Sequence, residues 1–105
     1  MIPKIKVLHR SYEVKPFDPH DIATNGHYGR THHREQIIYL DMNAASTELA
    51  DTLLHEVMHA VINCMGINAG GDQDEENVVN SLSHGLTTVF HDNPKLLDEI
   101  KGLLK

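Results

Sequence analysis

The sequence predicts an α+β domain in which a small antiparallel sheet of about three strands packs against helices on one of its sides. Short β-favouring segments all precede residue 42, whereas long segments with helical periodicity all follow residue 46. Strands that come first and helices that follow them are typical of this fold class. The 105 residues contain no repeat, low-complexity segment or dividing linker, so we expect one domain over residues 1–105.

The expected strands are short. Polar and apolar side chains interleave over Ile5–Val14, which predicts a first strand that Pro16 ends. Residues Asp21–Asn25 are expected to form a short helical turn, and His27–Thr31 a short extended segment. The run Gln36–Asp41 contains consecutive β-branched, aromatic and aliphatic residues and predicts the next strand.

A polar loop over residues 32–35 joins the last two of these segments. It contains two adjacent histidines, His32 and His33, a residue type that can bind a metal ion. Loops between strands normally run over the protein surface. We therefore interpret both histidines as part of a solvated loop.

The first helix is expected from Thr47 to Met65. Apolar residues recur there at helical spacing around most of the surface, and no Pro or Gly interrupts them. Ser46 offers an N-cap oxygen, and Gly66 is the residue type that commonly closes a helix. This apolar coverage predicts that the helix lies in the core.

Two further helices are expected after a glycine-containing loop. One runs from about Asp74 to His91, and Asp72 and Glu75 have the spacing of a capping box at its start. The other is short and runs through Leu103. It begins at Asn93-Pro94, with Asn as the cap and Pro at the first helical position.

Composition narrows the classes of function. A net charge of −6 and a pI near 5.8 give no electrostatic basis for binding nucleic acid. No apolar run is long enough to span a bilayer, and the first residues lack the apolar segment of a signal peptide. Cys64 is the single cysteine, which excludes an internal disulfide and predicts a cytoplasmic setting. It is expected to be a packed thiol rather than a metal ligand.

The segment His55-Glu56-Val57-Met58-His59 carries the strongest chemical signal. Two histidines four positions apart on a helix share one face and can bind one tetrahedral ion. Glu56 points about a quarter turn away, where it can act on a water molecule rather than on the metal. Because nine residues are His, the pattern can arise by chance, but buried His and Glu side chains need partners that a metal provides. We therefore predict one Zn²⁺ per chain.

A catalytic zinc site usually has three protein ligands and one open position. The second expected helix carries a polar stripe, which suits either a solvated face or one wall of a metal cleft. The stripe comprises Glu76, Asn80, Ser83, Thr87 and, less centrally, His84 and His91. Glu76 is favoured over Glu75 as the third ligand because it begins the stripe.

Residues 37–93 resemble the gluzincin metallopeptidases. The motif His55-Glu56-x-x-His59, followed after a short loop by Glu76-x-x-x-Asn80, is similar to small gluzincin-like proteins. Among these are the minigluzincins and the metallopeptidase domains of the ImmA/IrrE type. The resemblance implies a zincin-like fold in which His55, His59 and Glu76 bind zinc, Glu56 is the base, and Asn80 orients His55.

The sequence also departs from these families. Thermolysin-like gluzincins commonly have Asp at the position of Asn80, and an amide raises the basicity of a ligand less than a carboxylate does. Ser81-Leu82 replaces the Phe-Ala pair common in the ImmA/IrrE pattern. No DNA-binding or sensor domain accompanies the motifs, so cleavage of a repressor is not implied.

These residues predict zinc-dependent hydrolysis of peptide bonds in a peptide or protein substrate. Glu56 is expected to take a proton from zinc-bound water and return it to the leaving amine. A second donor is expected to stabilise the oxyanion, and the candidates are His84, Tyr28 and His91. The segment His27–Thr31 is a candidate for pairing with the substrate backbone. A chain this short supplies little of the second subdomain that closes over the substrate in larger peptidases. Activity is therefore expected to be narrow in substrate range or latent.

Two alternatives stay open. The chain can be a non-catalytic zinc-binding domain that binds a protein partner, although a structural zinc usually has four protein ligands and needs no Glu56. It can also be a metal hydrolase that acts on substrates other than peptides. The natural substrate, the cleavage specificity and the oligomeric state do not follow from the sequence.

Overall fold

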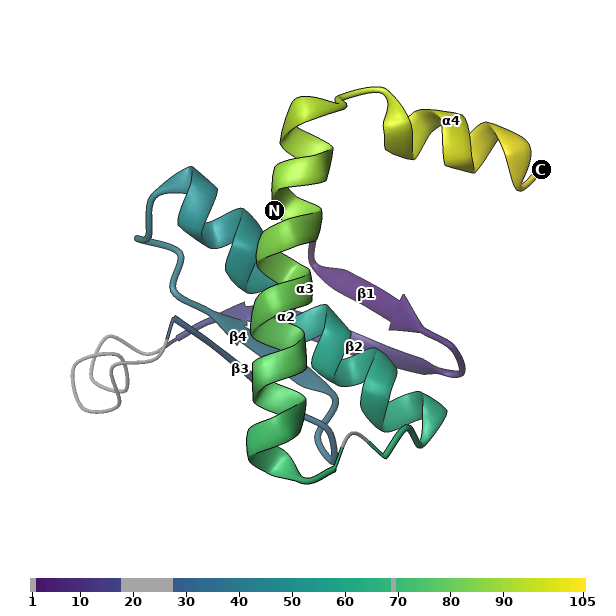
Figure 1. Ribbon diagram of the computed structural model, residues 1–105. Coiled ribbons are helices and arrows are strands. Elements are labelled where there is room, and N and C mark those ends of the chain that lie inside the picture. The colour runs from purple at the N-terminus through teal and green to yellow at the C-terminus, as the bar shows by residue number, and fades with distance from the viewer. Residues whose placement is uncertain (1, 18–27, 69) are drawn as a thin grey trace.

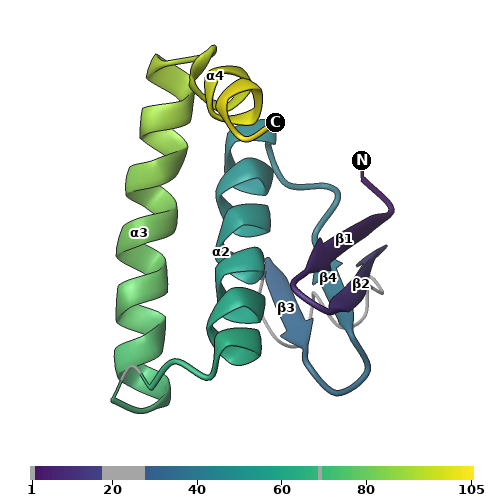
Figure 2. The same cartoon turned by 90° about the vertical axis from the view of Figure 1, so that its right-hand side faces the viewer.

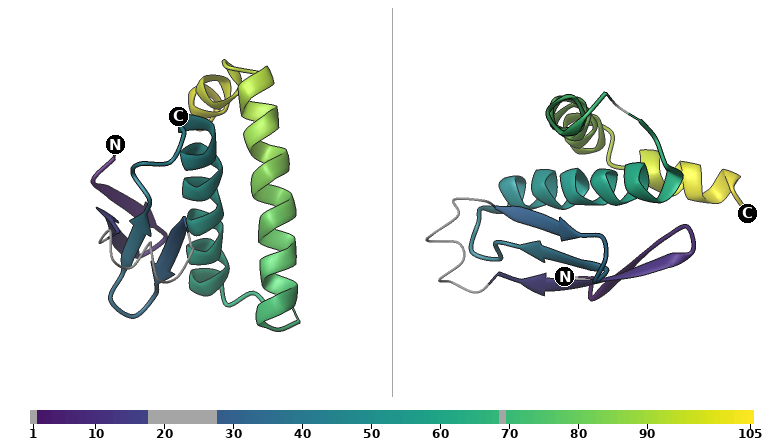
Figure 3. Two further views of the ribbon diagram at one scale, coloured as in Figure 1. Left: turned by 90° about the vertical axis from the view of Figure 1, so that its left-hand side faces the viewer. Right: turned by 90° about the horizontal axis from the view of Figure 1, so that it is seen from below.

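The computed structural model describes residues 2–17, 28–68 and 70–105 (Figure 1). A four-stranded sheet is covered on one side by helix α2 (Ser46–Met65), and helix α3 (Asp72–Asp92) packs on α2 from the other side (Figures 2 and 3). The predicted α+β class is confirmed. Within the described ranges, no helix has the length and apolar character needed to cross a membrane. The helical turn expected at Asp21–Asn25 lies outside the described residues.

The sheet is mixed and has one strand more than expected. Its strands are β1 (Lys4–Val7), β2 (Arg10–Pro16), β3 (Gly29–His32) and β4 (Ile37–Leu40), in the spatial order β1-β2-β4-β3. The pairs β1–β2 and β3–β4 are antiparallel, whereas β2 and β4 are parallel. Because β4 lies between β2 and β3, the outermost strand beside α2 is β3 (Figure 2). The expected sheet of about three antiparallel strands thus has four strands and one parallel pair.

The additional strand results from a hairpin inside the segment that was expected to be one strand. The chain reverses at Leu8 and His9, and Leu8 has a φ of 55°. Tight hairpin turns of this kind are normally marked by Gly, Asn or Asp, which tolerate positive φ. Neither turn residue is of those types, so the turn left no local signal in the sequence.

The core lies between the sheet and one face of α2. Its buried members are Val7, Tyr12, Ile38, Leu40 and Ala60. Half-buried residues of α2 pack against them at helical spacing, among them Leu49, Leu53, Val57 and Cys64. Cys64 is therefore a packed thiol, as predicted, and its Sγ lies 3.8 Å from the Tyr12 hydroxyl.

The ends of the helices differ from the sequence expectations in three places. Gly66 closes α2 with a φ of 66°, as expected, but Ser46 is the first helical residue and the N-cap is Ala45. The N-cap of α3 is Gly71, and no side chain caps that helix. Helix α4 (Leu96–Leu103) begins two residues after Pro94. The side chain of Asn93 donates instead to the Val89 carbonyl at 2.9 Å and so ends α3.

Candidate metal centre

Two imidazole rings from α2 meet at the centre of the site. His55 and His59 lie one helical turn apart, and their Nε2 atoms are separated by 3.1 Å. Both side chains are largely buried, with 17% and 14% of their surfaces exposed. The spacing predicted from the sequence thus places two metal-binding nitrogens side by side.

Glu76, in the first turns of α3, completes a group of three candidate ligands. Its Oε1 lies 2.9 Å from Nε2 of His55, and its Oε2 lies 3.0 Å from Nε2 of His59. In a tetrahedral site with zinc–ligand distances of 2.0–2.1 Å, neighbouring ligand atoms are about 3.3 Å apart. The three side chains are thus close enough to hold a metal ion. The structure brings Glu76, and not Glu75, to this position.

Glu75 contacts the same site from behind. Its Oε2 lies 2.7 Å from Nδ1 of His59, the ring nitrogen that faces away from Glu76. A carboxylate there can accept a hydrogen bond from Nδ1, and in that tautomer the lone pair of Nε2 is free for an ion. The sequence expectations considered Glu75 for a capping box or as a substitute ligand and missed this role. Its position directly before Glu76 was the available signal, because successive helical residues can reach two edges of one ring.

Glu56 stands beside the ligand group but does not belong to it. Its side chain is 7% exposed, and its Oε2 is 4.0 Å from Nε2 of His55. The Thr31 hydroxyl, on strand β3, lies 2.7 Å from Glu56 Oε1 and holds this carboxylate in place. Burial raises the pKa of Glu56, and the Thr31 hydrogen bond opposes part of that rise. No sequence pattern indicated Thr31.

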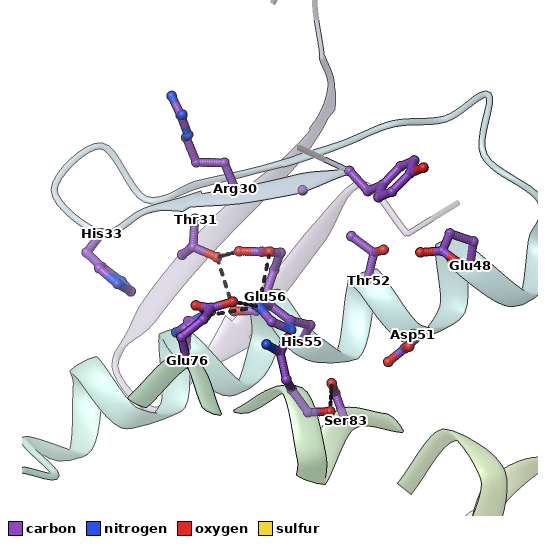
Figure 4. A pocket seen from close by; sticks show the side chains of 14 residues that line it. Arg30, Thr31, His33, Glu48, Asp51, Thr52, His55, Glu56, Glu76 and Ser83 are labelled. Carbon is purple, nitrogen blue, oxygen red and sulfur yellow. Dashed lines mark hydrogen bonds and ion pairs between the residues drawn. The ribbon is translucent and has the colours of Figure 1, made fainter. Parts of the chain in front are cut away.

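A cavity of about 570 Å³ opens onto these groups (Figure 4). Strand β3 forms one wall, α2 the floor, and α3 the opposite wall. Gly29 allows β3 to approach α2 closely, because a Cβ there would lie 2.5 Å from Cγ2 of Thr52 and 3.0 Å from Oε2 of Glu56. With this volume the cavity can hold a ligand, and strand β3 borders it.

The remaining predicted site residues lie at different distances from this cavity. Asn80 and Tyr28 line it, but within the described residues Asn80 makes no hydrogen bond to His55. His84 is 81% exposed, is not part of the cavity lining, and lies 3.7 Å from Asp51. His91 is 82% exposed and pairs with its neighbour Asp92 outside the cavity.

His33 was expected in a solvated loop, but it lines the cavity. Its Nδ1 is inaccessible to solvent and has no hydrogen-bond partner among the residues described. Burial lowers the pKa of this imidazole. The sequence offered only the pair of adjacent histidines as a signal, and nothing in it distinguished His33 from His32.

Comparison with protein-family models, with curated proteins and with solved structures finds no match for this chain. The resemblance to gluzincins therefore stays a prediction from sequence motifs.

Proposed function

We propose that this protein is a zinc-dependent peptidase. The observation that carries the proposal is the convergence of His55, His59 and Glu76 next to Glu56, a carboxylate left outside the ligand group, at the floor of an open cavity. Two imidazoles and one carboxylate are a ligand set found in catalytic zinc sites of peptidases. A site that only stabilises the fold would normally use a fourth protein ligand.

The three donor groups are better suited to a bound zinc ion than to an empty site. Both Nε2 atoms face one carboxylate and lie within hydrogen-bonding distance of each other, so one cation between them would interact favourably with all three groups. Bound zinc would supply Lewis acidity, which makes water a stronger nucleophile and polarises a carbonyl group. Three protein ligands leave one tetrahedral position for water or substrate.

The chain's own groups supply the proton transfers. Glu56 accepts a proton from the attacking water and delivers it to the leaving amine nitrogen. Thr31 donates to one oxygen of Glu56 and leaves the other oxygen, Oε2, on the side of His55. The carboxylate is thus held at the edge of the ligand group, within reach of a water molecule there.

Strand β3 supports a peptide as the substrate. It is the outermost strand of the described sheet, and Gly29, Arg30 and Thr31 line the cavity. An extended peptide can add to such an edge by backbone hydrogen bonds, which recognise the chain irrespective of its side chains. Pairing with β3 would hold a scissile bond over the floor formed by α2.

The test compares the wild type with Glu56→Gln and with Glu99→Gln, a control on the exposed helix α4. Each purified protein is analysed for zinc and then incubated with a peptide library whose products are read by mass spectrometry. We expect about one zinc in all three proteins, with cleavage by the wild type and by Glu99→Gln only. Full zinc content without cleavage by the wild type would instead indicate a non-catalytic zinc-binding domain.

A further inference from the structure

His33 brings a third imidazole into the cavity, from a different element than the two on α2. It follows the last residue of β3, and in Figure 4 its ring extends toward Glu76. The loop that carries it is tied to the rest of the fold, because Arg10 donates one hydrogen bond to the His33 carbonyl and one to Asn63 on α2, each at 3.3 Å. His33 is therefore held in place at its backbone.

Residues of β3 and the residue that directly follows the strand line the cavity. Side chains two positions apart in an extended segment point to the same side. Gly29 and Thr31 lie two positions apart in β3, and His33 follows the strand directly; all three line the cavity, as does Arg30. Gly29 permits close approach to α2, and Thr31 holds Glu56. His33 is the one whose side-chain Nδ1 has no hydrogen-bond partner among the described residues.

The neighbouring His32, the last residue of β3, has side-chain partners that His33 lacks. His32 lies 3.7 Å from Glu35, and its ring meets the Tyr39 ring edge-on at 5.2 Å. Its partners therefore account for its position. For His33, the described residues include no ion pair, aromatic contact or side-chain hydrogen bond that would do the same.

The two nitrogens of the His33 ring differ in access. Nδ1 is closed off from solvent, which leaves Nε2 as the ring nitrogen available to a ligand in the cavity. A buried N–H without an acceptor is rare and unfavourable, which places the proton of the neutral ring on Nε2. Burial also lowers the pKa of His33 and so favours this neutral form. In this form the ring would offer an N–H donor that no described residue uses.

We propose that His33 is a catalytic residue that donates a hydrogen bond from Nε2 to the oxygen of the scissile carbonyl as that oxygen becomes an oxyanion. This assignment rests on the proposed peptidase function. Water adds to the carbonyl carbon, the C=O π pair moves to the oxygen, and the pair returns as the C–N bond breaks. Glu56 carries the proton to the amine, so His33 neither gains nor loses one.

The other oxyanion candidates fit this role less well. His84 and His91 lie outside the cavity, and Tyr28 is 53% exposed at its rim. His33 lines the cavity, as does Thr31, whose hydroxyl positions the proposed base Glu56. A peptide paired with β3 would therefore meet the base and the donor along one strand.

The test uses zinc-loaded wild type, His33→Ala, His33→Gln and the control His32→Ala. The ligands are acetyl-Ala-Leu-Ala-amide and an analogue in which a phosphonamidate replaces its Ala–Leu bond and mimics the tetrahedral oxyanion. Affinities for both ligands and for zinc are measured by calorimetry. Values of kcat and KM are measured on a substrate from the library digest. Thermal melts check that each variant folds.

We expect His33→Ala to lower kcat by about 10²–10³-fold, as for loss of one oxyanion donor, with little change in KM. Its affinity for the phosphonamidate should fall to a similar extent, whereas its affinities for the amide peptide and for zinc should stay at the wild-type values. His33→Gln, whose amide can donate, should lie between, and His32→Ala should match the wild type.

Three results for His33→Ala would overturn the assignment alone. These are an unchanged affinity for the phosphonamidate, an equal loss of affinity for the phosphonamidate and the amide peptide, or a loss of zinc binding. A wild type that binds zinc but neither cleaves the library nor binds the phosphonamidate would refute the proposed function together with this assignment.

Discussion

Glu75→Ala tests whether the carboxylate behind His59 supports the metal centre without being a ligand. The 2.7 Å contact between Glu75 Oε2 and His59 Nδ1 is short, as expected for a charge-assisted hydrogen bond. It is also shielded, because the His59 and Glu75 side chains are 14% and 28% exposed. Such partners orient a metal-binding imidazole and raise its basicity, and their loss typically weakens metal binding 10–100-fold. At about 1.4 kcal/mol per tenfold change, this is about 1.4–2.8 kcal/mol of zinc-binding free energy.

The same site provides a graded series of variants. Glu75→Gln keeps an acceptor next to Nδ1 and should lose less affinity than Glu75→Ala. Glu76→Ala removes a ligand and should lose more than either. Asp72→Ala is the matched control, because it removes one negative charge from the first turn of α3 while the described structure gives Asp72 no contact with His59.

The assay is a competition titration of each apoprotein against a chromophoric zinc chelator at neutral pH and physiological ionic strength. Under these conditions the effect of a distant surface charge is largely screened. If Glu75→Ala bound zinc as tightly as the wild type, or lost no more affinity than Asp72→Ala, the hydrogen bond to His59 would have no role in metal binding.

Two further predictions concern stability. Gly29→Ala should destabilise the protein by about 1–3 kcal/mol in urea unfolding, because the added Cβ would lie 2.5 Å from Thr52 Cγ2 and push β3 away from α2. Gly85→Ala, at an open position within α3, should instead be neutral or stabilising by up to about 1 kcal/mol, and equal behaviour of the two variants would contradict the close approach. In the absence of metal, Glu56→Gln should raise the melting temperature near neutral pH, because burial raises the pKa of Glu56 and the ionised carboxylate is unfavourable there. A raised pKa means that the folded state binds the proton more tightly, so wild-type stability falls as the pH rises above about 4.5, where the unfolded carboxyl ionises. The gap between Glu56→Gln and the wild type should therefore close at lower pH, and melts in chelator that show a constant gap would refute this account.

The sequence alone determined those parts of the site that one helix can arrange. An α-helix brings residues four apart together wherever it packs, so the spacing of His55 and His59 was sufficient to place their Nε2 atoms side by side. The same periodicity predicted that this helix packs in the core and that the polar stripe of the next helix begins at Glu76. The class of fold followed from the order of the segments along the chain.

Interactions between elements required the tertiary structure. Thr31, His33 and Glu75 reach the site only because β3 and α3 pack against α2 from opposite sides, and no local pattern encodes that meeting. The sheet gives the same lesson: the turn at Leu8 lacks the usual turn residues, and the parallel pairing of β2 with β4 joins segments more than twenty residues apart in sequence. Short-range geometry can be read from residue spacing, because the backbone constrains it directly. The side chains that surround Glu56 and His33 come from segments far apart in sequence. Only the packing of those segments in the folded chain decided which side chains they are.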